Sequence, residues 1–258
     1  MGDSSLYLGV AEDYAATRPP YPPRVYDTLE TACGKAFGEL AVIDVGAGTG
    51  IASAAMAARG ARVLAVEPSP DMVRRLRTHG RGVVAIRGDG NRLPVADDVA
   101  DLVCYAQSWH WTDPRRSVPE ALRVLRPGGL LALWWNVPDF DVAWVARQHE
   151  RFRRRIPRYH GYAGKDATAA LGAPPFELTL EQHTVRWTRA VSLVEHLRML
   201  RTLSFVDALE SSDRATVLDA ERAALADEFP DGVVTESYRT ELTLARPPAS
   251  ATRAGPGR

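Results

Sequence analysis

Short apolar runs alternate with helical patterns of apolar and polar residues between Leu40 and Asn136. Runs of strand length that are separated by helices are typical of βαβ units in a parallel sheet. Five strands are predicted in this stretch: Leu40–Val45, Arg62–Val66, Val83–Ile86, Asp101–Ala106 and Leu130–Trp135. The helices predicted between them are the alanine-rich segment Ile51–Arg59, a helix capped by Ser69 with Pro70 at its first position, and a helix from Asp113 to Leu125.

The C-terminal half has a different pattern. Phe140–Ile156 is predicted to be a helix, whereas Tyr159–Pro175 is rich in Gly, Ala and Pro and is predicted to be a loop. Two further strands, with two helices between them, are predicted in the order Thr179–Thr188, Val191–Thr202, Asp213–Phe229 and Ser237–Ala245. The predicted fold class is therefore α/β, with a doubly wound, Rossmann-like sheet of seven strands that is mostly parallel. The last two strands could form an antiparallel edge, and the segment before them is long enough to form a lid over the strand ends.

Composition and charge narrow the class of protein. The 258 residues are 45% hydrophobic and 25% charged, close to the globular average, so wholesale disorder is excluded. Lys plus Arg and Asp plus Glu each total 32, and this zero net charge counts against a general nucleic-acid binder. All basic residues except Lys35 and Lys165 are arginines, which we attribute to a GC-rich genome in preference to phosphate or carboxylate recognition.

Compartment and metal content are also predicted. Two cysteines, Cys33 and Cys104, can form neither a disulfide framework nor a four-cysteine zinc site, and they fit a reducing cytosol. The chain begins without a recognisable signal peptide, and no apolar run reaches the roughly 18 residues of a membrane span. The histidines lack metal-ligand spacing such as H-E-x-x-H. We therefore expect a cytoplasmic protein with no metal and no membrane partner.

A glycine-rich turn joins the first predicted strand to the first helix. In VIDVGAGTG the glycines stand at positions 46, 48 and 50, in the pattern G-x-G-x-G. Glycine permits a tight turn and a close approach of the backbone to a ligand, and the helix start offers N–H groups to an anion. Ile51 occupies the place of the third glycine of the dinucleotide fingerprint, and no Lys-Ser or Lys-Thr follows Gly50 as in a P-loop. A tight βα connection without a ligand is the structural alternative.

Two carboxylates follow neighbouring strands. Glu67 ends the second strand, where it could accept hydrogen bonds from both ribose hydroxyls of an adenosine. The alternative is a solvated charge at a strand end, which the upstream glycines disfavour. Asp89 follows the third strand, where it could accept a hydrogen bond from the adenine amine, although Asp in Gly-Asp-Gly is also a common turn former.

Four motifs occur in order between residues 40 and 136: VIDVGAGTG, VEPSPDM, GDGNRLPVADDVADLV and VLRPGGLLAL. Together they resemble the motif series of class I S-adenosylmethionine-dependent methyltransferases. The resemblance implies a seven-stranded sheet with its last strand antiparallel, and a cofactor site in which the three turn glycines face the methionine part, Glu67 the ribose and Asp89 the adenine. It also implies that Asp44 orients the turn or reaches the methionine amino group through water.

The flanking segments AEDYAATRPPYP, AQSWHWTDP and SYRTELTLARP are similar to a bacterial subgroup of small-molecule methyltransferases that includes trans-aconitate methyltransferase-like proteins. The expected S-adenosylmethionine site comprises Tyr14, Arg18, Asp44, Gly46, Ala47, Gly48, Gly50, Glu67, Pro68, Met72, Asp89, Gly90 and Gln107. The expected acceptor site comprises Tyr21, Trp109, Trp111 and Trp135.

Several of these assignments have structural alternatives. His110 is the candidate general base, because imidazole titrates near neutrality, or it is a structural histidine beside the cofactor. Trp109 and Trp111 could cover the adenine or the acceptor, or could belong to the core. Arg18 could hold the carboxylate of the methionine part or of an acidic acceptor, or could lie in a proline-restrained surface arm. The lid arginines are more typical of a solvated helix face than of a binding surface: Arg147, Arg151, Arg153, Arg154, Arg155 and Arg158.

The pattern also predicts five regions. These are an N-terminal arm and helix over the cofactor pocket (1–38), an S-adenosylmethionine-binding core (39–137), a lid that determines acceptor specificity (138–178), C-terminal strands and helices that complete the sheet (179–246), and a disordered tail (247–258).

The hypothesis from sequence is a methyltransferase that acts on a small molecule, either a carboxylic acid or a specialised metabolite, and forms S-adenosylhomocysteine as product. O-, N- and C-methylation are all open, and a base is needed only where the nucleophile enters protonated. The alternatives are a non-catalytic adenosine-cofactor-binding regulatory protein and a nicotinamide-dependent oxidoreductase. No Asn/Asp-Pro-Pro-Tyr/Phe motif follows the fourth strand, which disfavours nucleic acid as a partner. The chain is expected to be a monomer or a homodimer.

Overall fold

A computed structural model describes residues 17–80, 82–157, 159, 161 and 167–247. The strands are β1 (Ala41–Val45), β2 (Arg62–Glu67), β3 (Val83–Arg87), β4 (Ala100–Ala106), β5 (Leu125–Pro138), β6 (Thr179–Ser192) and β7 (Val233–Arg246). The helices are α2 (Pro23–Cys33), α3 (Ile51–Ala58), α4 (Pro70–His79), α5 (Pro114–Val124), α6 (Ala143–Arg155), α7 (Ala167–Gly172), α8 (Leu193–Arg201), α9 (Ser204–Asp207) and α10 (Ser211–Glu228), with 3-10 turns η2 (Phe37–Glu39) and η3 (Trp109–Trp111).

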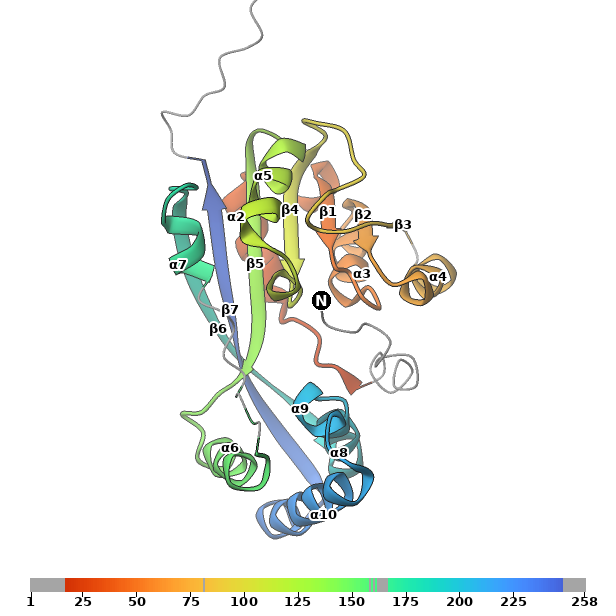
Figure 1. The fold of residues 1–258 in the computed structure, drawn as a ribbon, viewed down its shortest axis with the longest axis vertical. Coiled ribbons are helices and arrows are strands. Elements are labelled where there is room, and N and C mark those ends of the chain that lie inside the picture. Colours follow the sequence, from red (N-terminus) through yellow and green to blue (C-terminus); the bar gives the residue numbers. More distant parts are fainter. Residues whose placement is uncertain (1–16, 81, 158, 160, 162–166, 248–258) are drawn as a thin grey trace, which may run out of the picture.

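The strands form one seven-stranded sheet in the order β3-β2-β1-β4-β5-β7-β6 (Figure 1). Strands β1 to β5 pair in parallel, and β7 runs antiparallel to both of its neighbours, β5 and β6. This confirms the predicted sheet, with the last strand antiparallel. Asp44 pairs with Ala65 of β2 and with Cys104 of β4. This register brings the carboxyl ends of β1, β2 and β4 to the same edge of the sheet.

Helices cover both faces of the sheet because the strand residues alternate between two apolar clusters. Val42 of β1 packs in a cluster with α2 and α3, whereas Ile43 and Val45 pack in a cluster with α5 and α7. Helix α4 packs beside β2 and β3 through Leu76. Its start is as predicted, since the Ser69 side chain accepts a hydrogen bond from the Met72 N–H. The core therefore fixes α3 and α4 just beyond the ends of β1 and β2.

The last three strands, β5, β6 and β7, are longer than the sequence pattern predicts. β5 begins at Leu125 instead of Leu130, and β7 begins at Val233 instead of Ser237. The register explains the additional length of β6 and β7, because these two strands pair without interruption from Thr179 opposite Arg246 to Ser192 opposite Val233. Their hydrogen bonds hold the ends of both strands in extended form without requiring an alternating pattern there.

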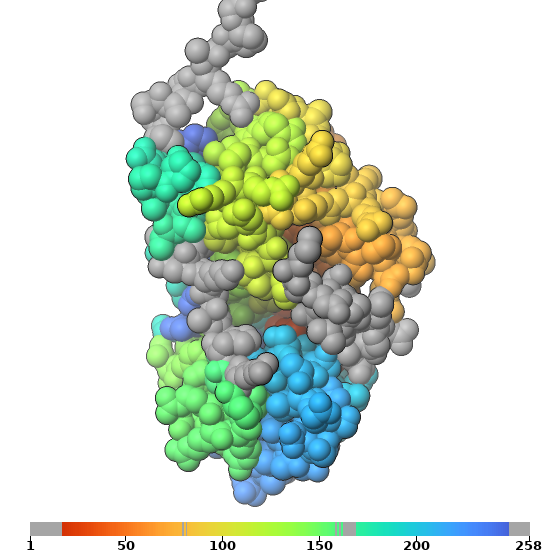
Figure 2. Space-filling view, viewed as in Figure 1, coloured from red at the N-terminus to blue at the C-terminus, as the bar shows by residue number. Residues whose placement is uncertain are grey.

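These long strands carry a second lobe made of α6 and α8–α10, drawn at the lower end of Figure 1. Its core contains Phe152, Leu200, Phe205 and Val206. Figure 2 shows this lobe, in green and blue, below the orange and yellow surface of the sheet domain. Within the segment expected to be a lid, α6 belongs to this lobe. Helix α7, in the predicted loop, instead packs on the sheet face, where Leu171 joins the α5 cluster. None of the helices in the described part of the chain combines the length and the apolar character needed to cross a membrane.

Candidate active site

A cavity of about 590 Å³ lies between the carboxyl ends of the parallel strands and the helical lobe. The predicted site residues that line it are Arg18, Tyr21, Gly46, Ala47, Gly48, Glu67, Pro68, Met72, Asp89, Gly90, Gln107, His110, Trp111 and Trp135. Asp44, Gly50 and Trp109 are not part of its wall, and Tyr14 lies outside the described residues. The structure thus brings most of the predicted site residues around one space.

The turn after β1 owes its shape to glycine. Gly46 and Gly48 have φ values of +68° and +58°, which residues with a Cβ seldom adopt. A Cβ on Gly46 would lie 2.5 Å from the Cβ of Ser108, whereas a Cβ on Gly48 would meet no atom within 4 Å. Packing against the β4 end therefore requires glycine at position 46. The open space beside Gly48 is part of the cavity and leaves room for a ligand to touch the backbone.

Glu67 connects this turn to the start of α4. Its Oε2 accepts a hydrogen bond from the Gly48 N–H at 2.8 Å, and its Oε1 accepts one from the Ser69 N–H at 2.9 Å. Burial raises the pKa of Glu67, and the two backbone hydrogen bonds oppose that shift. A carboxylate has about four lone-pair sites, so two remain to accept hydrogen bonds from a ligand.

Asp44 lies beneath the turn and contacts α3. It is fully buried and accepts hydrogen bonds from Ser53 Oγ at 2.5 Å and from Cys104 Sγ at 3.6 Å. Burial raises the pKa of Asp44 to about 6, and the hydrogen bonds from Ser53 and Cys104 limit the shift. Asp44 is thus placed to hold the β1 end against α3 and Cys104.

Asp44→Asn is expected to reduce the loss of stability with rising pH. Because the folded pKa lies above the unfolded value, the contribution of Asp44 is greatest below about pH 4 and is lost as the pH rises through about 6. The free energy of unfolding of the variant minus that of the native chain should rise by about 2 kcal/mol from about pH 4.5 to about pH 7.5. Urea unfolding at the two pH values measures this difference. An equal effect of the substitution at both pH values would contradict it.

The expected adenine end contains one predicted carboxylate and one residue that the sequence did not single out. Asp89 Oδ1 accepts hydrogen bonds from the backbone N–H and the side-chain amide of Asn91, so the carboxylate does shape its turn. The hydroxyl of Tyr105 is buried, and it has no partner among the described residues. Tyr105 lines the cavity from β4, where its sequence pattern indicates only a core strand position.

The segment after β4 holds the candidate base. The indole Nε1 of Trp135 donates to Nδ1 of His110 at 3.4 Å. Since an indole can only donate, the proton of neutral His110 belongs on Nε2. Trp111 is 61% exposed and lines the cavity, whereas Trp109 is buried and donates to Ser117 Oγ. Trp109 therefore has the core role that was its alternative.

Residues 17–20 cross between the two lobes. Arg18 donates from Nη2 to the carbonyl oxygen of Thr202 at 3.0 Å, and Arg189 donates to that of Thr17 at 2.8 Å. On the sheet side, the side-chain amide of Asn136 donates to the carbonyl oxygen of Pro20 at 2.9 Å. This segment is therefore part of the cavity wall and is bonded to both lobes.

The far end of the cavity is built by residues that the sequence did not indicate. They lie on α6, α8, α9 and β7 and at the cap of α9: Trp144, Gln148, His196, Met199, Leu203, Phe205, Glu236 and Tyr238. No spacing in the sequence links them, because they come from separate elements that meet only in the fold. A partial signal is the capping box of Ser192 and Glu195, which fixes the start of α8 at Leu193, three residues before His196.

The arginines of α6 pair with acidic residues. Arg151 and Arg147 bond Glu221 and Glu228 of α10, and Arg154 bonds Glu150 of its own helix. None of the described arginines of this run lines the cavity. Arg153 and Arg154 are exposed, as on the predicted solvated helix face, whereas Arg151 joins α6 to the buried Glu221. Arg158 lies outside the described residues. Across the described residues, no group of three or more His, Cys, Asp or Glu side chains could hold a metal ion.

Comparison with known proteins assigns the family. A model of a methyltransferase domain matches residues 43–133. An uncharacterised methyltransferase of Mycobacterium tuberculosis is 35% identical over 225 residues, 87% of each chain. The chain belongs to the class I methyltransferase family. A methyltransferase-like protein of Schizosaccharomyces pombe is 27% identical over 84% of each chain.

Solved structures show the same fold for this methyltransferase. A protein of Anaeromyxobacter dehalogenans, assigned as a type II methyltransferase, superposes with a TM-score of 0.66 at 22% identity and covers 88% of this chain and 96% of that one. A protein of Anabaena variabilis, assigned as a methyltransferase from an antibiotic biosynthesis pathway, gives a TM-score of 0.60 at 19% identity. The match covers 86% of this chain and 97% of that one. At these identities the likeness is one of fold alone.

Proposed function

We propose that this methyltransferase transfers the methyl group of S-adenosylmethionine to a small molecule bound in the same cavity. The observation that carries the proposal is the continuity of that cavity. It reaches from Gly48 and Glu67, at the ends of β1 and β2, to Phe205 and Tyr238 of the helical lobe. Its volume of about 590 Å³ is within the range of small-molecule sites.

The residues at the sheet end fit the methyl donor. Glu67 has lone pairs to accept hydrogen bonds from the ribose hydroxyls, and the space beside Gly48 leaves room for the methionine part. We expect the adenine to contact Asp89 and the hydroxyl of Tyr105, which has no partner in the described part of the chain. The donor brings an already activated methyl group, so the main task of the protein is to align the donor with the acceptor.

The flanking segments favour, within the proposed function, the small-molecule subgroup that includes trans-aconitate methyltransferase-like proteins.

Two alternatives from the sequence remain, a non-catalytic binding protein and an oxidoreductase. A non-catalytic protein that binds only the adenosine cofactor would need no acceptor space, which the lobe end of the cavity supplies. A nicotinamide-dependent oxidoreductase is disfavoured, because Ile51 stands where the dinucleotide fingerprint has its third glycine.

Calorimetric titration tests the donor. We expect S-adenosylmethionine to bind and NAD not to bind. Glu67→Gln should weaken S-adenosylmethionine binding about 10- to 100-fold, because a charged hydrogen-bond acceptor contributes about 1.5–3 kcal/mol. Glu39→Gln is the matched control, since Glu39 is exposed and lies outside the cavity wall. Binding of NAD in place of S-adenosylmethionine would refute the proposal. A screen for methyl uptake by phenols, acids and amines then separates an enzyme from a binding protein.

A further inference from the structure

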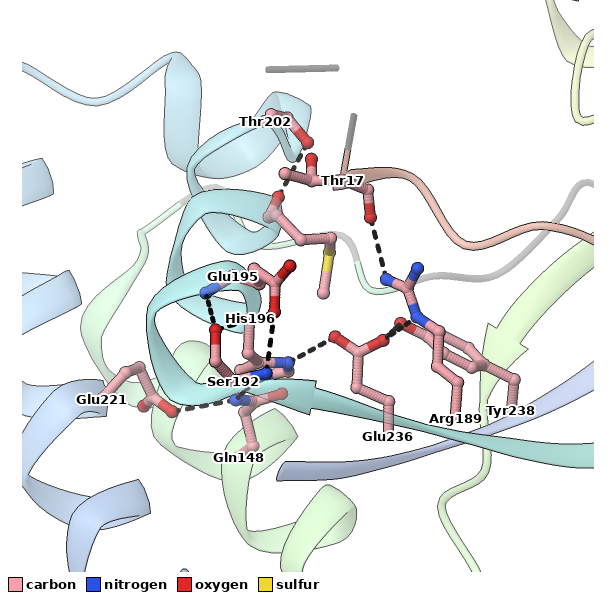
Figure 3. Close-up of polar contacts among 11 residues, drawn as sticks. Thr17, Gln148, Arg189, Ser192, Glu195, His196, Thr202, Glu221, Glu236 and Tyr238 are labelled. Atoms are coloured by element: carbon pink, nitrogen blue, oxygen red, sulfur yellow. Dashed lines mark hydrogen bonds and ion pairs between the residues drawn. The ribbon is translucent and has the colours of Figure 1, made fainter. Parts of the chain in front are cut away.

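A buried polar cluster forms one wall of the lobe end of the cavity. We define the His196 cluster as Gln148, Arg189, His196, Glu221, Glu236 and Tyr238, which Figure 3 shows joined from α6, β6, α8, α10 and β7. His196 is at its centre, with Nδ1 2.7 Å from Glu236 Oε1 and Nε2 3.1 Å from the amide nitrogen of Gln148. Both His196 and Gln148 line the cavity.

The hydrogen bonds determine where the proton of His196 lies. The amide nitrogen of Gln148 also donates to Glu221 Oε2 at 3.2 Å, and a carboxylate can only accept, so this –NH₂ group is the end of the amide that faces His196. His196 Nε2 must therefore accept from Gln148, and Nδ1 must donate to Glu236. Neutral His196 thus carries its proton on Nδ1 and a lone pair on Nε2.

Glu236 is well placed to support a positive charge on this ring. It is 1% exposed, and it accepts hydrogen bonds from Arg189 Nε at 2.5 Å and from the Tyr238 hydroxyl at 3.0 Å. Burial would raise the pKa of Glu236, but the hydrogen bonds and charges of His196 and Arg189 lower it below its ordinary value. An ionised carboxylate behind an imidazole orients the ring and stabilises the imidazolium that forms when Nε2 takes a proton.

The two cavity histidines therefore have opposite tautomers. His110 accepts from Trp135 on Nδ1 and carries its proton on Nε2, whereas His196 has its lone pair on Nε2. Among the described residues, the sole partner of that nitrogen is the amide N–H of Gln148. The hydroxyl of an acceptor molecule could replace the amide N–H as donor, because a hydroxyl is also a hydrogen-bond donor.

We propose that His196, positioned by Glu236, takes the proton of an uncharged aromatic hydroxyl compound, a phenol, that occupies the lobe end of the cavity. The inference rests on the proposed function. The ring would pack against Trp144, Met199 and Phe205, which line this end. The charges of the cluster are paired, Glu236 with Arg189 and Glu221 with Arg151, so this wall offers no unpaired cation to a carboxylate acceptor.

In the reaction the phenol oxygen uses a lone pair to form the new C–O bond to the donated methyl carbon, and the C–S bond pair remains on sulfur. The phenol proton moves to Nε2 of His196, and the resulting imidazolium is held by Glu236. General-base assistance of this kind contributes about 10²- to 10⁴-fold to a rate.

The test is to compare phenols that differ in acidity: 4-methoxyphenol, 4-chlorophenol, 4-nitrophenol and pentafluorophenol, with S-adenosylmethionine labelled in its methyl group, at mildly alkaline pH. His196→Asn should lower kcat/KM about 10²- to 10⁴-fold for the two weakly acidic phenols, and little for the two that are already ionised. Glu236→Gln should show the same selectivity with a smaller loss. His183→Asn is the matched control, because His183 pairs with Glu181 on β6 outside the cavity wall.

A second measurement uses the unaltered protein. With ¹⁵N-labelled imidazoles, and with the His196→Asn spectrum for assignment, the neutral form of His196 should show a protonated Nδ1 and an unprotonated Nε2. The opposite tautomer, or equal losses for all four phenols in His196→Asn, would overturn the inference. Methylation of none of the phenols by a protein that binds S-adenosylmethionine would also overturn it and leave the proposed function intact. Failure to bind S-adenosylmethionine would refute the proposed function itself.

Discussion

Replacing Gly46 with alanine is expected to destabilise the fold by roughly 2–5 kcal/mol. Two costs add at this position. The φ of +68° is unfavourable to any residue with a Cβ, at about 1–2 kcal/mol, and the new Cβ would lie 2.5 Å from the Ser108 Cβ, an overpacking cost of about 1–3 kcal/mol. Ser108 cannot easily retreat, because it is buried and its Oγ donates to the carbonyl oxygen of Val45 at 2.5 Å. The substitution therefore strains the junction of β1 with the segment after β4.

Gly34→Ala separates the two costs. Gly34 has nearly the same φ, +66°, but a Cβ there would meet no atom within 4 Å. Gly34→Ala should therefore lower the free energy of unfolding by the conformational cost alone, about 1–2 kcal/mol. Urea unfolding followed by tryptophan fluorescence gives both free energies. Similar losses in the two variants would show that the contact with Ser108 relaxes at little cost.

The fold could be predicted because its first half is encoded locally. The apolar run before Gly46, the glycine turn and the cap at Ser69 each specify an element from adjacent residues, and each lies within about two residues of its predicted place. The ends of β6 and β7 could not be predicted in this way, since they are extended because each pairs with the other. A pairing of residues such as Ser192 and Val233 leaves no periodic pattern in either segment.

The same distinction divides the candidate site. The sheet end of the cavity follows short motifs, so Gly48, Glu67 and Asp89 could be chosen from their place after successive strands. The lobe end brings together Gln148 and His196, which come from helices in different parts of the chain and touch through one hydrogen bond. The capping box before His196 marks only the start of a helix, and Gln148 has no motif around it, so the sequence could indicate only His110, which follows β4.

Arg151→Ala is expected to destabilise the chain by about 4 kcal/mol. Glu221 is fully buried on α10 and accepts two hydrogen bonds from Arg151 of α6, each 2.8 Å long. Without Arg151 the carboxylate would keep, among the residues that the structure describes, only the hydrogen bond from Gln148, and a buried charge that loses its partner typically costs about 3–5 kcal/mol. The loss should loosen the contact of α6 with α10, and with it the wall that holds His196.

Arg154→Ala is the matched control on the same helix, because Arg154 is 74% exposed and pairs with Glu150 at the surface. Exposed ion pairs contribute little to the free energy of unfolding, so Arg154→Ala should unfold at nearly the same urea concentration as the native chain. The double variant of Arg151→Ala with Glu221→Gln should recover part of the loss, since it removes the buried charge and keeps an oxygen for Gln148. Urea unfolding of the four chains measures these differences. If the double variant were no more stable than Arg151→Ala alone, the loss would come from packing of the arginine side chain instead of from the unpaired carboxylate.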